Sequence, residues 1–156
     1  MKFTVSKDLR KNIVMRNLLI AFSIITLLFL ALDITAKTLR FGASISEIKA
    51  NILGNEEEFL EPLSMISALE ILHLDLFLAI ILLLMISSIF MRVDAKFKAG
   101  LLSSTMLFSI ISFSSFFGAL FFGELFVTIS VVTFILWHLG AAWIVLISLI
   151  WLFKKQ

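Results

Sequence analysis

Four long apolar segments dominate the sequence and limit what it can fold into. They cover residues 17–36, 64–91, 100–122 and 125–153. Each can cross a hydrocarbon core of about 30 Å, for which a helix needs about 20 residues. The apolar runs are continuous, whereas the strands of a membrane barrel alternate. We therefore expect an all-α polytopic membrane protein in which residues 1–156 form a single membrane domain.

The composition agrees with this class and excludes several others. Hydrophobic residues make up 61% of the chain and charged residues 15%, whereas soluble domains are about half apolar and one quarter charged. Cysteine is absent, which excludes disulfide scaffolds and thiol redox chemistry. No serine lies in a recognisable nucleophile elbow. The sequence therefore specifies no enzymatic reaction.

The basic residues predict the orientation. Ten of the 13 Lys and Arg residues precede the first span, separate the second span from the third, or end the chain: Lys2, Lys7, Arg10, Lys11, Arg16, Arg92, Lys96, Lys98, Lys154 and Lys155. Cytoplasmic loops are enriched in such residues, so we expect a multi-pass protein of the bacterial inner membrane with both termini in the cytoplasm. The clusters are short and lack interleaved aromatic residues, which argues against nucleic-acid binding.

The segment 37–63 is the only sizeable polar region and is expected in the periplasm. Its apolar residues recur at the spacing of one helix face: Ile45, Ile48, Ile52 and Leu53. This pattern predicts a short amphipathic helix on the membrane surface, ended by Gly54. Pro62 suits the first turn of the second span. The remaining connections are short, so neighbouring spans should be antiparallel in an up-down four-helix bundle.

Small hydroxyl residues mark one face of the third span. Thr105, Ser109 and Ser112 share this face at helical spacing. Such residues let helices approach closely in lipid. We interpret the face as a packing surface, with a solute path as the alternative.

Six ionisable residues lie inside the predicted spans or close to their outer ends: Asp33, Glu70, His73, Asp75, Glu124 and His138. Each charge at membrane depth costs about 2.5 to 3.5 kcal/mol, so such residues mark candidate functional sites. Glu70 and His73 are about 60° apart around a helix and share a face. Asp75 lies about 160° from His73 and should face another helix or a partner subunit.

His73 and His138 are candidate ligands of a b-type haem. They lie on two different spans at similar predicted depths, and bis-histidine ligation of haem iron needs one imidazole on each side of the ring. Gly140 and its neighbours leave room for a porphyrin, or let two helices touch. Glu70, His73 and His138 are also the candidate ligands of another metal. The alternative is that no cofactor binds and that Glu70 and His73 form a buried pair.

One stretch resembles a known family. The run 54–58 ends the outer loop, and Glu70, His73, Asp75 and Phe77 follow in the second span. This stretch is similar to a family of small bacterial inner-membrane proteins of poorly defined function, whose second span opens with Glu-x-x-His-x-His-Leu-Phe. Asp75 replaces the second histidine of that pattern. The resemblance implies that Glu70 and His73 are functional, and it implies no reaction. The architecture is also loosely similar to small membrane cytochromes b.

Three functions remain open at this level. The first is a haem-binding electron-transfer subunit that works with a periplasmic electron carrier. The second is a non-catalytic accessory or assembly subunit of a larger membrane complex, with a partner subunit or further copies of itself. The third is a small transporter or proton path, in which Asp33, Glu70, His73 and Glu124 form a relay open to the outside.

Overall fold

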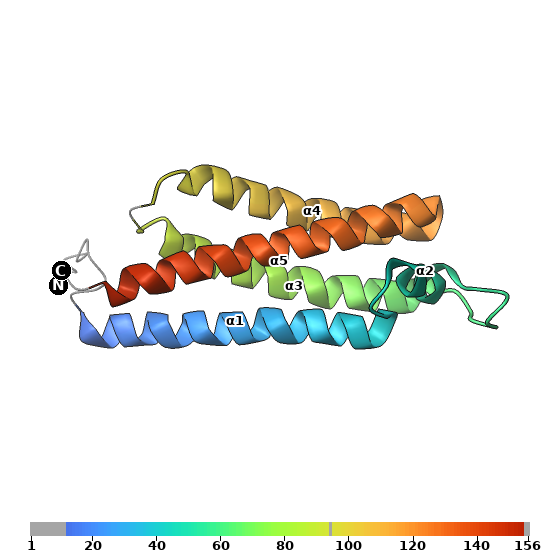
Figure 1. Cartoon of the computed structure of the whole chain (residues 1–156), viewed down its shortest axis with the longest axis horizontal. Coiled ribbons are helices and arrows are strands. Elements are labelled where there is room, and N and C mark those ends of the chain that lie inside the picture. The colour runs from blue at the N-terminus through green and yellow to red at the C-terminus, as the bar shows by residue number, and fades with distance from the viewer. Residues whose placement is uncertain (1–11, 94, 155–156) are drawn as a thin grey trace.

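The computed structural model describes residues 12–93 and 95–154, and this part of the chain is helical (Figure 1). Its helices are α1 (Ile13–Phe41), α2 (Ile45–Leu53), α3 (Met65–Phe90), α4 (Lys98–Phe122) and α5 (Glu124–Phe153). The basic residues Lys2, Lys7, Arg10, Lys11 and Lys155 of the orientation argument lie outside the described residues.

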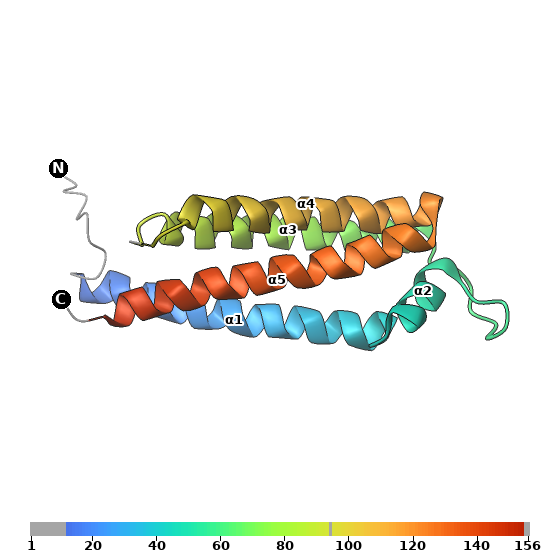
Figure 2. The same cartoon turned by 45° about the horizontal axis from the view of Figure 1, so that its top comes forward.

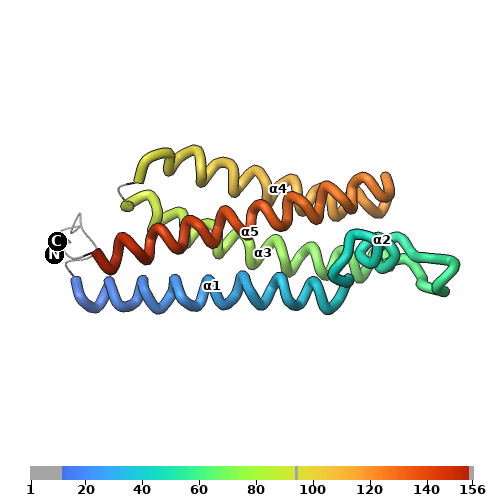
Figure 3. Tube along the Cα trace, viewed as in Figure 1, coloured from blue at the N-terminus to red at the C-terminus, as the bar shows by residue number. Residues whose placement is uncertain are grey.

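The four long helices run side by side as an antiparallel bundle, while α2 crosses one end of it (Figures 2 and 3). The shortest of the four, α4, has 25 residues, and at about 1.5 Å per residue it exceeds a 30 Å hydrocarbon core. All four are long and apolar enough to span a membrane. The predicted fold class, an up-down bundle of four membrane-spanning helices, is confirmed. We call its two ends the α2 end and the basic end, the latter carrying Arg16, Arg92 and Lys98.

Local capping chemistry sets the helix boundaries. Asn12 accepts a hydrogen bond from the Met15 N–H at 3.1 Å and begins α1, which extends beyond the predicted span at both ends. Ser64 accepts one from the Ser67 N–H at 3.2 Å and begins α3. Pro62 therefore precedes the helix and does not lie in its first turn, contrary to the prediction. Ser and Asn are favoured caps because their oxygens satisfy free N–H groups of the first turn.

The short helix α2 forms with the bounds expected from its apolar pattern, but it does not simply lie on a lipid surface. Ile52 is 3% exposed and packs with Phe41, Ile71 and Val127 at the end of the bundle. Its N-cap Ser44 accepts a hydrogen bond from the Glu47 N–H at 3.2 Å. The apolar face of α2 thus closes the bundle because it finds apolar partners on three of the long helices.

Helices α4 and α5 are connected by a single residue, Gly123, and approach each other closely. The backbone at Gly123 has a φ of +79°, a conformation that favours glycine. A Cβ atom built on Gly140 of α5 would lie 2.4 Å from the Thr105 Oγ1 of α4. Ser112 and Ser130 each donate a hydrogen bond to the other's carbonyl oxygen at 3.2 Å. The predicted packing role of the hydroxyl face is therefore confirmed, and the space beside Gly140 is filled by α4.

Candidate functional site

The central feature of the candidate site is a hydrogen-bonded pair formed by His138 of α5 and Asp33 of α1. His138 is buried, with 2% of its side chain exposed, and its Nε2 lies 3.0 Å from the Asp33 Oδ2. The other ring nitrogen, Nδ1, lies 2.9 Å from the Phe134 carbonyl oxygen. Because a carbonyl oxygen can only accept, Nδ1 carries a proton and donates a hydrogen bond to the Phe134 carbonyl oxygen.

This arrangement leaves one proton to be shared between His138 and Asp33. With Nδ1 protonated, the Nε2 atom is either an N–H that donates to a carboxylate or an acceptor that receives the O–H of a carboxylic acid. The pair is formally neutral in both forms. A proton can therefore move between these two atoms with no change in the net charge buried inside the bundle.

A second ionisable pair lies next to the first. The Lys37 Nζ of α1 donates to the Asp75 Oδ2 of α3, and the two side chains are 22% and 24% exposed. Asp33 and Lys37 are four residues apart on α1, so they lie on the same face one turn from each other. The single helix α1 thus supplies one partner to each pair. Asp75 faces α1, as its position opposite to His73 predicts.

Two internal spaces border these pairs. A void of about 10 Å³ is lined by both carboxylates, Asp33 and Asp75, and by Trp137, whose buried Nε1 has no hydrogen-bond partner in the described part of the chain. A larger cavity of about 190 Å³ is lined by Lys37, Asp75 and the Ser112–Ser130 contact, and it extends to Ile48 and Ile52 of α2. An open space therefore continues from Lys37 and Asp75 toward the α2 end, where its lining is apolar.

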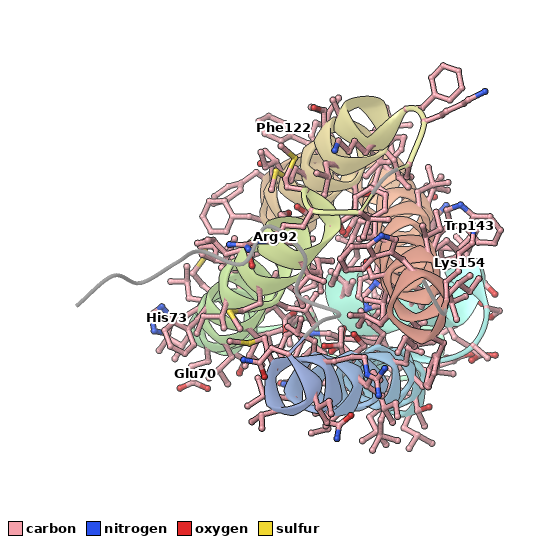
Figure 4. The ribbon with its side chains drawn as sticks, turned by 90° about the vertical axis from the view of Figure 1, so that its left-hand side faces the viewer. Glu70, His73, Arg92, Phe122, Trp143 and Lys154 are labelled. Atoms are coloured by element: carbon pink, nitrogen blue, oxygen red, sulfur yellow. The ribbon has the colours of Figure 1, made fainter. Side chains whose placement is uncertain are left out.

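The structure does not bring the two candidate haem ligands together. Glu70 and His73 share a face, as predicted, but they are exposed and point outward from α3 (Figure 4). His138 points into the bundle, and both of its ring nitrogens have partners. The residues therefore do not fit a haem held by His73 and His138 within one chain. Similar depth along the helices does not bring the two histidines together, because helix rotation directs His138 into the bundle and His73 out of it.

The other candidate residues do not join the two pairs. Glu124 accepts a hydrogen bond from the Lys49 Nζ at 2.8 Å on the surface of the α2 end, so it does not take part in an internal relay. Among the described residues, no three His, Asp or Glu side chains form a group that can hold a metal ion. The candidate set of Glu70, His73 and His138 is accordingly dispersed.

Lys37 belongs to the second pair, although the sequence predicts it in the outer loop. The structure continues α1 to Phe41, and this extension places Lys37 inside the bundle. The spacing of Asp33 and Lys37, an acid followed by a base one turn later, was the available signal. This spacing is informative only if the helix is known to continue through both residues.

The fold and these two ionisable pairs define the class: a multi-pass helical membrane protein with ionisable groups between its helices. The chain belongs to the Aq_1264_TM family, described as a transmembrane helical domain, whose model matches residues 42–156. The match includes Asp75 and His138, while their partners Lys37 and Asp33 lie on α1, before the matched residues. No curated protein and no solved structure matches the chain.

Proposed function

We propose that the protein is a small proton-coupled membrane transporter whose proton-binding site is the Asp33–His138 pair. The observation that carries this proposal is the pair itself: a carboxyl oxygen and an imidazole nitrogen 3.0 Å apart inside a bundle of apolar helices. Ionisable residues at such depth are costly and mark ion pathways and proton relays. Imidazole exchanges protons near neutral pH, and carboxyl groups serve with it in the proton relays of membrane proteins.

Proton exchange would take place from the α2 end. Asp33 is 21% exposed, whereas His138 is 2% exposed, so a proton would enter or leave at the Asp33 carboxyl. The small void joins this carboxyl to Asp75, and about 10 Å³ is near the minimum that a single water molecule requires. The larger cavity then continues from Asp75 to α2.

The composition of the half of the bundle near the basic end indicates that protons exchange only from the α2 end. Between His138 and the basic residues at the far end, the described spans carry no ionisable side chain. Buried hydroxyl groups there donate to carbonyl oxygens of their own helices, as Ser23 does to Leu19 and Ser148 to Ile144. Passage of the proton to the basic end therefore requires a second conformation, as alternating access would provide.

The other two functions remain predictions. A haem-binding electron-transfer subunit with a periplasmic carrier has no support from the positions of His73 and His138. An accessory subunit would be favoured by an Asp75 that needs a partner subunit, but Lys37 of the same chain pairs with Asp75. Bacterial inner-membrane localisation and cytoplasmic termini rest on the distribution of basic residues.

Charge displacement after a pH step tests the proposal without knowledge of the transported substrate. Proteoliposomes adsorbed on a solid-supported membrane give a transient current when a proton binds inside the protein. We expect this current in the wild-type protein and its loss in Asp33→Asn and His138→Gln. Glu58→Gln, which changes an exposed carboxyl of the loop between α2 and α3, serves as the matched control and should keep it.

The proposal is contradicted if the wild-type protein gives no more current than protein-free vesicles, or if Asp33→Asn retains the full current. Circular dichroism and gel filtration of each variant show whether the bundle is intact. A loss of current counts only in variants that keep the helix content and elution volume of the wild-type protein.

A further inference from the structure

The outward face of α3 carries two ionisable residues that the proton site does not use. Glu70 and His73 are exposed, and neither forms a hydrogen bond or ion pair with another described residue. They lie five and eight residues after the start of α3 at Met65, or about 7.5 and 12 Å along a helix of about 39 Å. Lipid tails offer no partner to a carboxylate or an imidazole, so an unpartnered pair at this depth is costly.

The same face has the spacing of a helix-pairing seam. Glu70 and His73 occupy two consecutive positions of a stripe that repeats every four and then three residues: Ile66, Glu70, His73, Phe77, Ile80 and Leu84. Its apolar members are 58 to 72% exposed. A 4–3 repeat keeps one stripe of a helix against a second helix over several turns.

The chemistry of the stripe indicates which helix it meets. A partner must supply a base for Glu70 and an acid for His73 at the same depth. A second copy of this chain does both, because copies inserted in the same direction place their α3 helices parallel and in register. Residues 70 and 73 of one copy then lie within one turn of residues 73 and 70 of the other, and each contact occurs twice about a two-fold axis.

We propose that two copies of this chain pair through the outward face of α3, with Glu70 of each copy bonded to His73 of the other. The seam is rimmed by apolar residues that pack against their counterparts, and the polar pair fixes its register and direction, as polar residues do in other helix seams. The contact leaves the Asp33–His138 pair untouched, so its test is independent of the proton site.

The absence of cysteine makes disulfide cross-linking in native membranes a direct test. We expect Phe77→Cys and Ile80→Cys to give a covalent dimer upon mild oxidation. Matched controls place a cysteine at similarly exposed positions on other helices, Leu28→Cys on α1 and Leu139→Cys on α5. These controls should stay monomeric.

A charge exchange tests the role of the polar pair. In the Phe77→Cys background, Glu70→Lys should lower the dimer yield at least fivefold, because it places bases opposite bases. Exchanging the two residues, Glu70→His with His73→Glu, should restore the yield. The proposal is overturned if the controls cross-link as well as the α3 positions, if Phe77→Cys and Ile80→Cys give no dimer or a cross-link to another protein, or if Glu70→Lys leaves the yield unchanged.

Discussion

At the scale of single residues, the two ionisable pairs have different chemistry although both start from α1. Asp33 and His138 form a hydrogen bond that holds one proton and is formally neutral while it is made, whereas Lys37 and Asp75 form an ion pair next to a cavity. Removing one member of an ion pair leaves a partly buried charge without a partner, and this costs more than removing both. The Lys37–Asp75 pair therefore lends itself to a double-mutant cycle.

We predict that Lys37→Met and Asp75→Leu each lower the free energy of unfolding by more than the double variant does. The coupling energy should be about 0.5 to 3 kcal/mol, the range for residues in direct contact. Unfolding in mixed micelles, followed by tryptophan fluorescence, measures it. Additive effects of the two substitutions would show that the side chains do not interact.

The sequence assigns the ionisable residues to helices well and predicts the direction of each side chain poorly. The sequence predicts His73 and His138 at similar depths and Asp33 nearer the outer surface, whereas the structure bonds Asp33 to His138. Which residues meet depends on how each helix is rotated, and packing sets the rotation: Gly140 against Thr105 turns α5 so that His138 faces α1. Such contacts leave little signal in one sequence, since serine, glycine and threonine occur on many helix faces.

At the scale of helices and their contacts, the approach of α4 to α5 depends on a missing side chain. A Cβ at Gly140 would lie 2.4 Å from Thr105 Oγ1, whereas one at Gly100 of α4 meets nothing within 4 Å. We predict that Gly140→Ala destabilises the bundle by about 1 to 3 kcal/mol, the usual cost of overpacking. Gly100→Ala, the matched control, should be neutral or stabilising because alanine favours helix. Equal effects of both variants on micelle unfolding would refute the close contact.

The N-terminus of α2 should respond to acid. The Ala43 backbone N–H and the Ser44 hydroxyl bond the Glu47 carboxylate and hold the pKa of Glu47 below its ordinary value of 4.5. A group with a lowered pKa stabilises the folded form above its ordinary pKa, and this contribution is lost as the pH falls through the lowered value. Amide exchange in α2, corrected for its intrinsic pH dependence, should therefore accelerate below about pH 4.5. Glu47→Gln should remove this acceleration, and an unchanged pH profile in that variant would contradict the assignment.

The number, order and direction of the helices could be predicted because apolar length and short connections determine them. The ends of α1 could not be predicted from hydropathy, since a capping residue, Asn12, and a glycine, Gly42, set them. Lys37 is hydrophilic but lies within α1, where Asp75 compensates its charge. A helix can thus extend beyond its apolar segment when a polar residue in the extension has a partner on another helix.

At the scale of the whole molecule, the two ends of the bundle should lie on opposite sides of the membrane. Phe59, 94% exposed, lies at the α2 end, and Lys96 is exposed at the basic end. We predict that a membrane-impermeant maleimide labels Phe59→Cys in spheroplasts of intact inner membrane and labels Lys96→Cys only after permeabilisation. The reverse pattern would place the basic end outside and contradict the orientation expected from the basic residues.

The most direct measurement of the central claim is the protonation of the His138 ring. The chain contains two histidines, so His73→Gln leaves His138 as the only ring in protein labelled with ¹⁵N-histidine. We predict that Nδ1 keeps its proton throughout a pH titration because it bonds the Phe134 carbonyl, that only Nε2 changes, and that Asp33→Asn alters this change. A ring with a bare Nδ1, or an Nε2 titration unaffected by Asp33→Asn, would contradict the shared proton on which the proposed function rests.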